Sequence, residues 1–127
     1  MIAAFMAISL LVQEPAPEPP DLLAVNFFSH FCGPCLVLDI RLEPVLPDYT
    51  DASIEFVRLN QTFGQGRARD TAAAYGLSDI YEQTGGSSGF ILLIDQSTGE
   101  ILDRLTIAQD ATEIRQRLDR ALHFAGR

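Results

Sequence analysis

The sequence contains no lysine and no tryptophan, and all nine of its basic residues are arginine. The missing lysine excludes a Walker-type phosphate loop, a Schiff-base lysine and a polybasic membrane patch. Seventeen acidic residues give the chain a formal net charge of −8. Because a surface of that sign repels phosphate backbones, we expect no nucleic-acid partner.

Cysteine and histidine are also scarce, with two of each in the chain. Two cysteines cannot build a disulfide scaffold, and a four-thiolate zinc site needs more of them than one chain supplies. Two histidines are too few for a multi-histidine metal site. We therefore expect no metal and no other cofactor within a single chain.

The rest of the composition is that of a globular domain. The chain has 127 residues, of which 47% are apolar and 20% are charged. A chain of this length buries roughly two-thirds of the surface that its unfolded form exposes, which is enough for one hydrophobic core. We expect one domain at residues 21–127, and a monomer in solution.

Residues 1–12 form an almost wholly apolar run, and residues 15–20 contain four prolines. The run is too short to span a membrane, which takes about 20 apolar residues, but it matches the roughly 7–15 of an export signal. Because the basic start of such a signal is missing, a helix or strand packed on the domain is the alternative. Residues 1–20 are interpreted as a leader, signal or anchor followed by an extended spacer. An exported protein would be periplasmic, touching the membrane only through this leader; the alternative location is cytoplasmic.

The apolar pattern of the domain alternates between the periods of strands and helices. It predicts strands at 22–28, 54–59, 90–94 and 101–107, and helices at 36–46, 67–75 and 111–125. Gly76 is placed to end the second helix. Asp110 and Glu113 form the pattern of a capping box before the third.

The order of these elements sets the fold class. Two strands joined through a helix imply a parallel pair with a right-handed crossover, and the final hairpin adds an antiparallel pair. We therefore expect an α/β fold with a mixed sheet of about four strands flanked by helices. Asp79, Tyr81 and Glu82 are interpreted as loop residues.

Cys32-Gly33-Pro34-Cys35 lies where the first strand leads into the first helix. Two intervening residues in a helical first turn bring the sulfurs within bonding reach. Pro34 suits this turn because an N–H there has no partner within the helix. Cys32 would lie at the helix N-terminus, where free amides and the macrodipole stabilise a thiolate, so it is the predicted nucleophile. Cys35, one turn later, would resolve the mixed disulfide.

This motif, preceded by a hydrophobic strand and followed by a helix, resembles that of the thioredoxin superfamily. The similarity in element order runs from about Leu22 to Ala125. It implies a thioredoxin-like fold and a thiol–disulfide oxidoreductase acting on protein disulfides or dithiols, with a recycling redox partner. Only the Cys-x-x-Cys core is common to the whole superfamily, so the motif indicates no subfamily.

The sequence departs from the thioredoxin pattern at several places, three of which lie at the proposed site. Phe31 stands where the family has tryptophan. Asn26 stands where thioredoxins bury an acid, and an amide cannot take the proton of the resolving thiol. The segment that would carry a cis-proline facing the cysteines contains Ser88 and Gly89 but no proline. We expect trans peptides here, with Gly89 allowing a close approach to Cys32.

Three interpretations of the site remain open at this stage. His30 could stabilise the Cys32 thiolate, or it could be a solvated residue at the end of the strand. The domain could be a binding or redox-sensing module that does not turn over disulfides, as Asn26 and the missing proline would favour. Two chains could also share a metal through four cysteine sulfurs.

Overall fold

The computed structural model describes residues 18–127 except Gly85. The elements are β1 (Leu22–Phe28), α2 (Gly33–Leu42), the 3-10 helix η1 (Leu46–Tyr49), β2 (Ile54–Asn60), α3 (Gly66–Ala74), α4 (Ser78–Thr84), β3 (Phe90–Asp95), β4 (Ile101–Leu105) and α5 (Ala111–Ala125). The apolar run predicted as a leader lies outside the described residues, as does most of the spacer. Within those residues, no helix has the length and apolar character needed to span a membrane.

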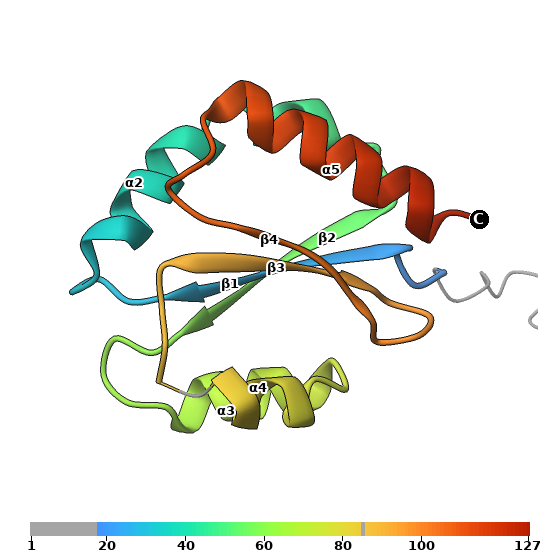
Figure 1. Cartoon of the computed structure of the whole chain (residues 1–127). Coiled ribbons are helices and arrows are strands. Elements are labelled where there is room, and N and C mark those ends of the chain that lie inside the picture. Colours follow the sequence, from blue (N-terminus) through green and yellow to red (C-terminus); the bar gives the residue numbers. More distant parts are fainter. Residues whose placement is uncertain (1–17, 85) are drawn as a thin grey trace, which may run out of the picture.

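The four strands form one mixed sheet in the order β2-β1-β3-β4 (Figure 1). β1 is parallel to β2 and antiparallel to β3, and β3 is antiparallel to β4. This arrangement confirms the predicted α/β fold class. β1 lies inside the sheet and is buried over its whole length, as its unbroken apolar run indicated.

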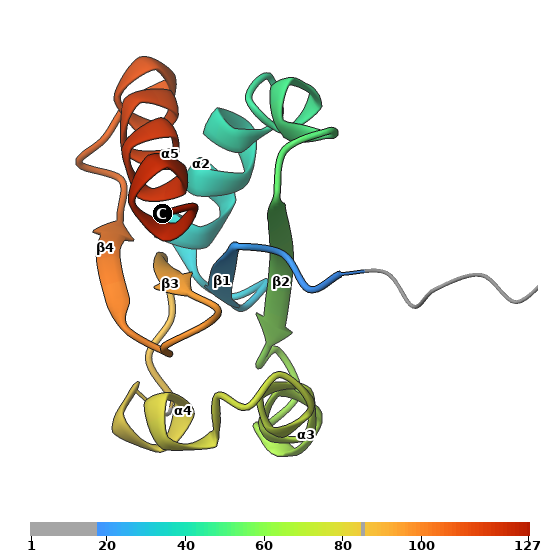
Figure 2. The ribbon, with the colours of Figure 1, turned by 90° about the vertical axis from the view of Figure 1, so that its right-hand side faces the viewer.

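Helices cover both faces of the sheet, with α2 and α5 on one face and α3 and α4 on the other (Figure 2). Side chains alternate along β1, so it contributes to two cores. Leu22 and Ala24 join the cluster beneath α2 and α5. Leu23, Val25 and Phe27 join the cluster beneath α3 and α4. The strand that leads into the cysteine motif is therefore fixed from both sides.

The first helix is shorter than predicted and begins earlier. α2 starts at Gly33, inside the motif, and ends at Leu42, whereas the sequence predicted a helix over 36–46. Pro44 lacks the N–H that would continue the helical hydrogen bonds. The chain then forms η1, with Pro47 in its first turn.

The interpretation of Asp79, Tyr81 and Glu82 as loop residues is wrong, because they belong to helix α4. Tyr81 is completely buried and is the only buried residue of this seven-residue helix. Its ring stacks on that of Phe27, with 6.3 Å between the ring centroids. A single apolar anchor gives no helical period, which is why the pattern did not reveal the helix.

Two predicted helix ends are confirmed. The Asp110 carboxylate accepts a hydrogen bond from the Glu113 N–H at 2.8 Å, and the Glu113 carboxylate accepts one from the Asp110 N–H at 3.3 Å. Gly76 follows α3 with φ of +72°, the left-handed conformation that ends many helices. The hairpin strand β4 ends at Leu105, two residues before the predicted end.

Candidate active site

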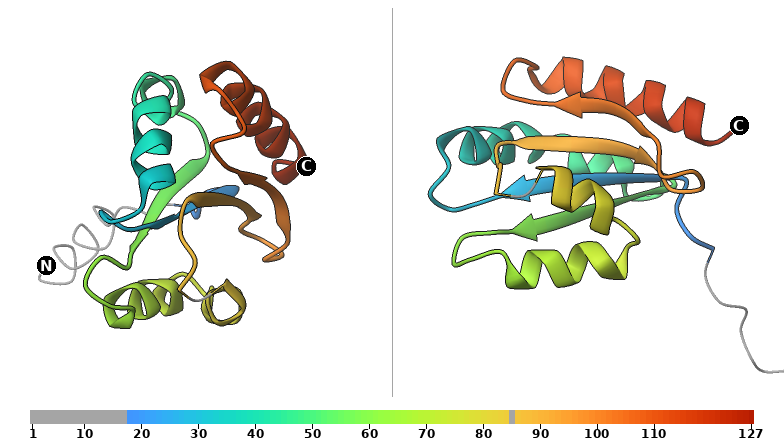
Figure 3. Two further views of the ribbon diagram at one scale, coloured as in Figure 1. Left: turned by 60° about the vertical axis from the view of Figure 1, so that its left-hand side comes forward. Right: turned by 60° about the horizontal axis from the view of Figure 1, so that its bottom comes forward.

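Three connecting segments meet at one edge of the sheet. The carboxyl ends of β1 and β2 and the amino end of β3 lie together there (Figure 3, right). The segments are residues 29–32, residues 61–65 and residues 86–89. The cysteine motif begins in the first of them, so the other two form its surroundings.

Cys32 is the N-cap of α2, and its sulfur accepts a hydrogen bond from the Cys35 N–H at 3.2 Å. A disulfide joins the two residues, whose Cα atoms are 5.3 Å apart, a separation usual for such bonds. Cys32 is partly exposed, whereas Cys35 is completely buried. The structure thus places Cys32 at the start of the helix and at the surface, as the sequence predicted; its role as nucleophile remains a prediction.

Cys35 packs against the end of β1, with its sulfur 3.7 Å from the Phe27 carbonyl oxygen. The neighbouring Asn26 is 8% exposed, and its Oδ1 has no hydrogen-bond partner among the described residues. A cavity of about 130 Å³ beside Asn26 is lined by apolar side chains and Arg58. Among the described residues, no carboxylate side chain lines this cavity.

Arg58 lies opposite Asn26 on β2. Its guanidinium forms an ion pair with Asp39 of α2 at 2.7 Å and covers the ring of Phe28 at 4.0 Å. This cation is therefore already paired with a carboxylate and an aromatic face. It joins α2 to β2 on the sheet face that carries Cys35.

Gly89, in the 86–89 segment, lies against the cysteine motif. Its φ is +93°, and its N–H donates to the Phe27 carbonyl at 2.9 Å. A Cβ added at Gly89 would lie 3.1 Å from Pro34 Cβ and 3.4 Å from Cys32 Sγ. No cis peptide bond occurs in the described ranges 18–84 and 86–127. Both the trans peptides and the close approach to Cys32 are thus confirmed.

An exposed aromatic pair lies beside Cys32. Phe31 is 79% exposed and Phe63 is 94% exposed, and their rings meet edge to face with 6.2 Å between centroids. Phe31 was singled out from the sequence as the residue in the tryptophan position. Phe63 was not; its only signal is a large aromatic residue next to Gly64 in a polar loop.

His30 does not bond to either cysteine in the described part of the chain. Its imidazole packs edge-on against the ring of Phe28, with 4.9 Å between centroids. Its backbone N–H donates to the Thr62 hydroxyl at 3.0 Å, which joins the 29–32 and 61–65 segments. The observed contacts are therefore structural, and an effect on the thiolate remains a prediction.

Metal-ligating side chains are not gathered within residues 18–84 and 86–127. No group of three or more histidine, cysteine, aspartate or glutamate residues lies there in an arrangement that could hold a metal ion. A metal bound through Cys32 and Cys35 would need ligands from outside this described part of the chain, such as a second chain.

The sequence matches no family model and no curated protein. Solved structures match it over most of its length. StoA from Bacillus subtilis is 14% identical, with a TM-score of 0.54, over 80% of this chain and 85% of that one. A thiol:disulfide interchange protein of the thioredoxin family from Chlorobium tepidum is 17% identical, with a TM-score of 0.56, over 80% of each chain. A thioredoxin-like protein from Aeropyrum pernix is 16% identical, with a TM-score of 0.52, over 94% of this chain and 98% of that one. These likenesses show that the chain has the thioredoxin-like fold.

Proposed function

We propose that this protein is a thiol–disulfide oxidoreductase that uses the Cys32–Cys35 pair on protein substrates. One observation carries the proposal: the two sulfurs form a disulfide in the first turn of α2, and only Cys32 is partly exposed. A buried partner that can reach the exposed sulfur provides both halves of a disulfide-exchange reaction. The thioredoxin-like fold supports the same conclusion by analogy alone.

In the reducing direction the reduced Cys32 thiolate attacks one sulfur of a substrate disulfide. A mixed disulfide forms, and the other substrate sulfur leaves as a thiolate. Cys35 then loses its proton and attacks Cys32 Sγ, so the internal disulfide forms and the second substrate thiolate leaves. The substrate gains two electrons, which the cysteine pair loses. A dithiol recycling partner must return them before the next cycle.

The start of α2 favours the thiolate form of Cys32. The Cys35 N–H already points at Cys32 Sγ, and the helix dipole adds positive potential at this end. Among the described residues, no backbone N–H donates to Cys35 Sγ, and Asn26 cannot accept its proton. We expect the resolving step to proceed faster as pH rises, because a larger fraction of Cys35 is then ionised.

The proposed partners are a protein disulfide or dithiol and a recycling redox protein. The same chemistry run in reverse would oxidise a dithiol. The apolar run at residues 1–12 supports the further proposal of an exported, periplasmic protein, since disulfides persist in such compartments. We propose that it acts there as a monomer.

The test is to trap the mixed disulfide with a Cys35→Ser variant. This variant, once reduced, should form a covalent adduct with a disulfide-bonded protein substrate such as insulin. Cys32 attacks the substrate disulfide, but no second thiol is present to resolve the adduct. The matched control, Cys32→Ser, keeps the buried thiol and should form none. If neither variant forms an adduct that dithiothreitol releases, the oxidoreductase proposal fails.

Two alternative functions predict different results, one in the trapping experiment and one in the metal content and mass of the purified protein. A redox-sensing module, which Asn26 and the trans segment at Gly89 favour, would form the internal disulfide but give no substrate adduct. A metal-bridged dimer would copurify with zinc or iron under reducing conditions and would have twice the mass of the chain. A metal-free monomer that forms adducts excludes both.

A further inference from the structure

The segment that faces Cys32 has little intrinsic stiffness. It contains Gly86, with φ of +82°, and Gly89, with φ of +93°, and no proline. Glycine has more conformational freedom than any other residue, so such a segment is poorly defined unless other groups hold it. Any molecule that forms a mixed disulfide with Cys32 must nevertheless pass beside it, since Gly89 borders Cys32 Sγ.

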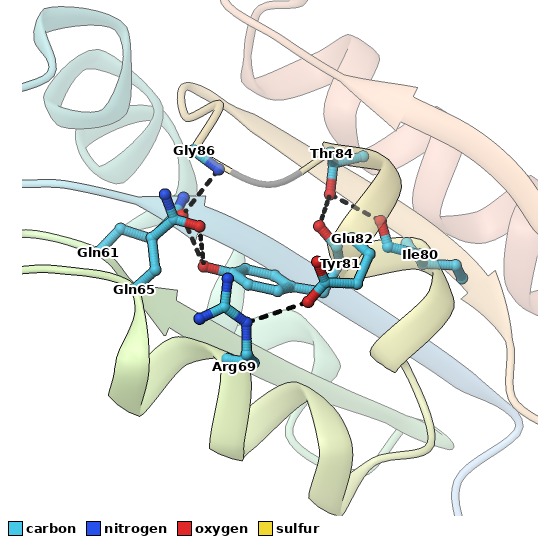
Figure 4. A network of polar contacts seen from close by, with 8 residues as sticks. All are labelled: Gln61, Gln65, Arg69, Ile80, Tyr81, Glu82, Thr84 and Gly86. Atoms are coloured by element: carbon cyan, nitrogen blue, oxygen red, sulfur yellow. Dashed lines mark hydrogen bonds and ion pairs between the residues drawn. The ribbon is translucent and has the colours of Figure 1, made fainter.

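The side chain of Gln61 reaches this segment from the loop after β2 and contacts Gly86 (Figure 4). Its Nε2 donates to the Ser87 carbonyl at 2.8 Å. Its Oε1 accepts from the Gly86 N–H at 3.3 Å. Both ends of the amide therefore bond to backbone groups of adjacent residues in the segment.

Gln61 is itself anchored to the core. Its backbone N–H donates to the Phe28 carbonyl at 2.8 Å, at the end of β1. Its Oε1 also accepts from the Tyr81 hydroxyl at 2.9 Å. A tyrosine hydroxyl is ordinarily protonated at neutral pH and can donate, and burial raises the pKa of Tyr81 further. A continuous set of contacts thus runs from the buried ring of Tyr81 through Gln61 to Ser87.

We propose that Gln61 is a positioning residue that holds residues 86–89 against Cys32, and so sets how a disulfide-bearing polypeptide is presented to that sulfur. The second half of this statement rests on the proposed oxidoreductase function. The first half concerns the position of the segment and can be measured without activity. In this protein a side-chain amide supplies the order that a glycine-containing segment lacks.

Two variants of Gln61 separate its contacts. Gln61→Leu removes every hydrogen bond of the residue 61 side chain while keeping the side chain similar in size. Gln61→Glu keeps acceptors for Tyr81 and Gly86 but cannot donate to Ser87, whose carbonyl oxygen it would repel. The matched control is Gln65→Leu. Gln65 Oε1 also lies near the Tyr81 hydroxyl, at 3.2 Å, and its Nε2 lies beside Gly86, but among the described residues it has no hydrogen bond to the 86–89 segment.

The first measurement is the hydrogen exchange of the Gly89 N–H, which donates to β1. Losing a hydrogen bond of ordinary strength should speed this exchange roughly three- to tenfold in both Gln61 variants, and should leave it within about twofold in Gln65→Leu. The second is the reduction of insulin, for which KM should rise by a similar factor while kcat stays within about twofold of wild type. A general loss of stability would not raise KM while leaving kcat nearly unchanged.

The proposal is overturned if both Gln61 variants leave Gly89 exchange unchanged, or if Gln65→Leu speeds it equally. It is also overturned as a substrate-presenting role if exchange speeds up but KM does not rise. A wild-type protein that reduces no insulin would contradict the proposed function instead, and Gly89 exchange would still decide whether Gln61 positions the segment.

Discussion

Gly89 lies against both Pro34 and Cys32, in a conformation that other residues rarely adopt. Replacing it with alanine would add a Cβ 3.1 Å from Pro34 Cβ and 3.4 Å from Cys32 Sγ. We expect Gly89→Ala to lower the free energy of unfolding by about 1–3 kcal/mol through backbone strain. It should also alter the rate at which iodoacetamide alkylates reduced Cys32, because the added methyl group would lie against the Cys32 sulfur. Urea unfolding and timed alkylation measure the two effects.

Gly99 provides the control for this substitution. Its φ is +76°, but nothing lies within 4 Å of an added Cβ. Gly99→Ala should therefore lower stability without changing the alkylation of Cys32. Equal alkylation rates in the two variants would show that Gly89 is not in contact with the reactive sulfur.

At the residue scale, the predictable part of the site was the part with a motif. Cys32, Cys35 and the missing proline before Phe90 could be identified by position along the chain. Gln61 and Phe63 could not, because their importance comes from contacts with residues far away along the chain. The side chain of Gln61 contacts residues 20 to 26 positions away, and Phe63 contacts Phe31, 32 positions away. A glutamine or a phenylalanine in a loop carries no periodic signal.

Tyr49 links two elements on the α2 and α5 side of the sheet. Its hydroxyl, at the end of η1, donates to Asp119 of α5 at 2.7 Å, and the Arg115 carbonyl oxygen lies 3.1 Å from the same hydroxyl. Because a hydrogen bond to a charged group is stronger than a neutral one, Tyr49→Phe should cost about 2 kcal/mol of unfolding free energy. The control is Tyr75→Phe, whose hydroxyl bonds to Glu55 at the surface and should cost much less. If urea unfolding shows that Tyr49→Phe and Tyr75→Phe lose the same unfolding free energy, the Tyr49 hydroxyl does not link η1 to α5 in the way described.

The hydrogen bond between Tyr49 and Asp119 also predicts that the free energy of unfolding depends on pH. Burial, followed by the hydrogen bond to Asp119, raises the pKa of Tyr49. In the unfolded chain a tyrosine loses its proton near pH 10, so the folded protein holds a proton that the unfolded chain has lost. This contribution to stability is complete below about pH 10 and declines as pH rises toward the folded pKa. Between pH 10 and pH 11, wild type should lose more stability than Tyr49→Phe.

At the element scale, strong periodicity and end signals were reliable. The capping box at Asp110 and Gly76 placed two helix ends correctly. The sequence did not predict helix α4, because this helix buries one side chain, Tyr81. It placed the end of α2 too late in the chain, because η1 follows α2 closely. Short helices are defined by tertiary contacts more than by their own sequence.

At the scale of the whole molecule, the sheet order determines the site. β1 lies between β2 and β3, so the loops after β1 and β2 and the segment before β3 converge on one edge. The parallel and antiparallel pairing followed from the order of strands and helices, which is why the fold class was predictable. The register that brings Phe27 opposite Leu59 and Phe90 was not readable from the sequence, because it depends on how both cores pack.

The central claim is that the Cys32–Cys35 pair turns over protein disulfides, and a turnover assay tests it most directly. Purified protein is supplied with insulin and a low concentration of dithiothreitol, and the release of insulin chains is followed in time. Wild type should accelerate the release at catalytic concentration, and Cys32→Ser should reduce the rate to that of dithiothreitol alone. A wild-type rate equal to that of Cys32→Ser would show that the Cys32–Cys35 pair does not turn over protein disulfides.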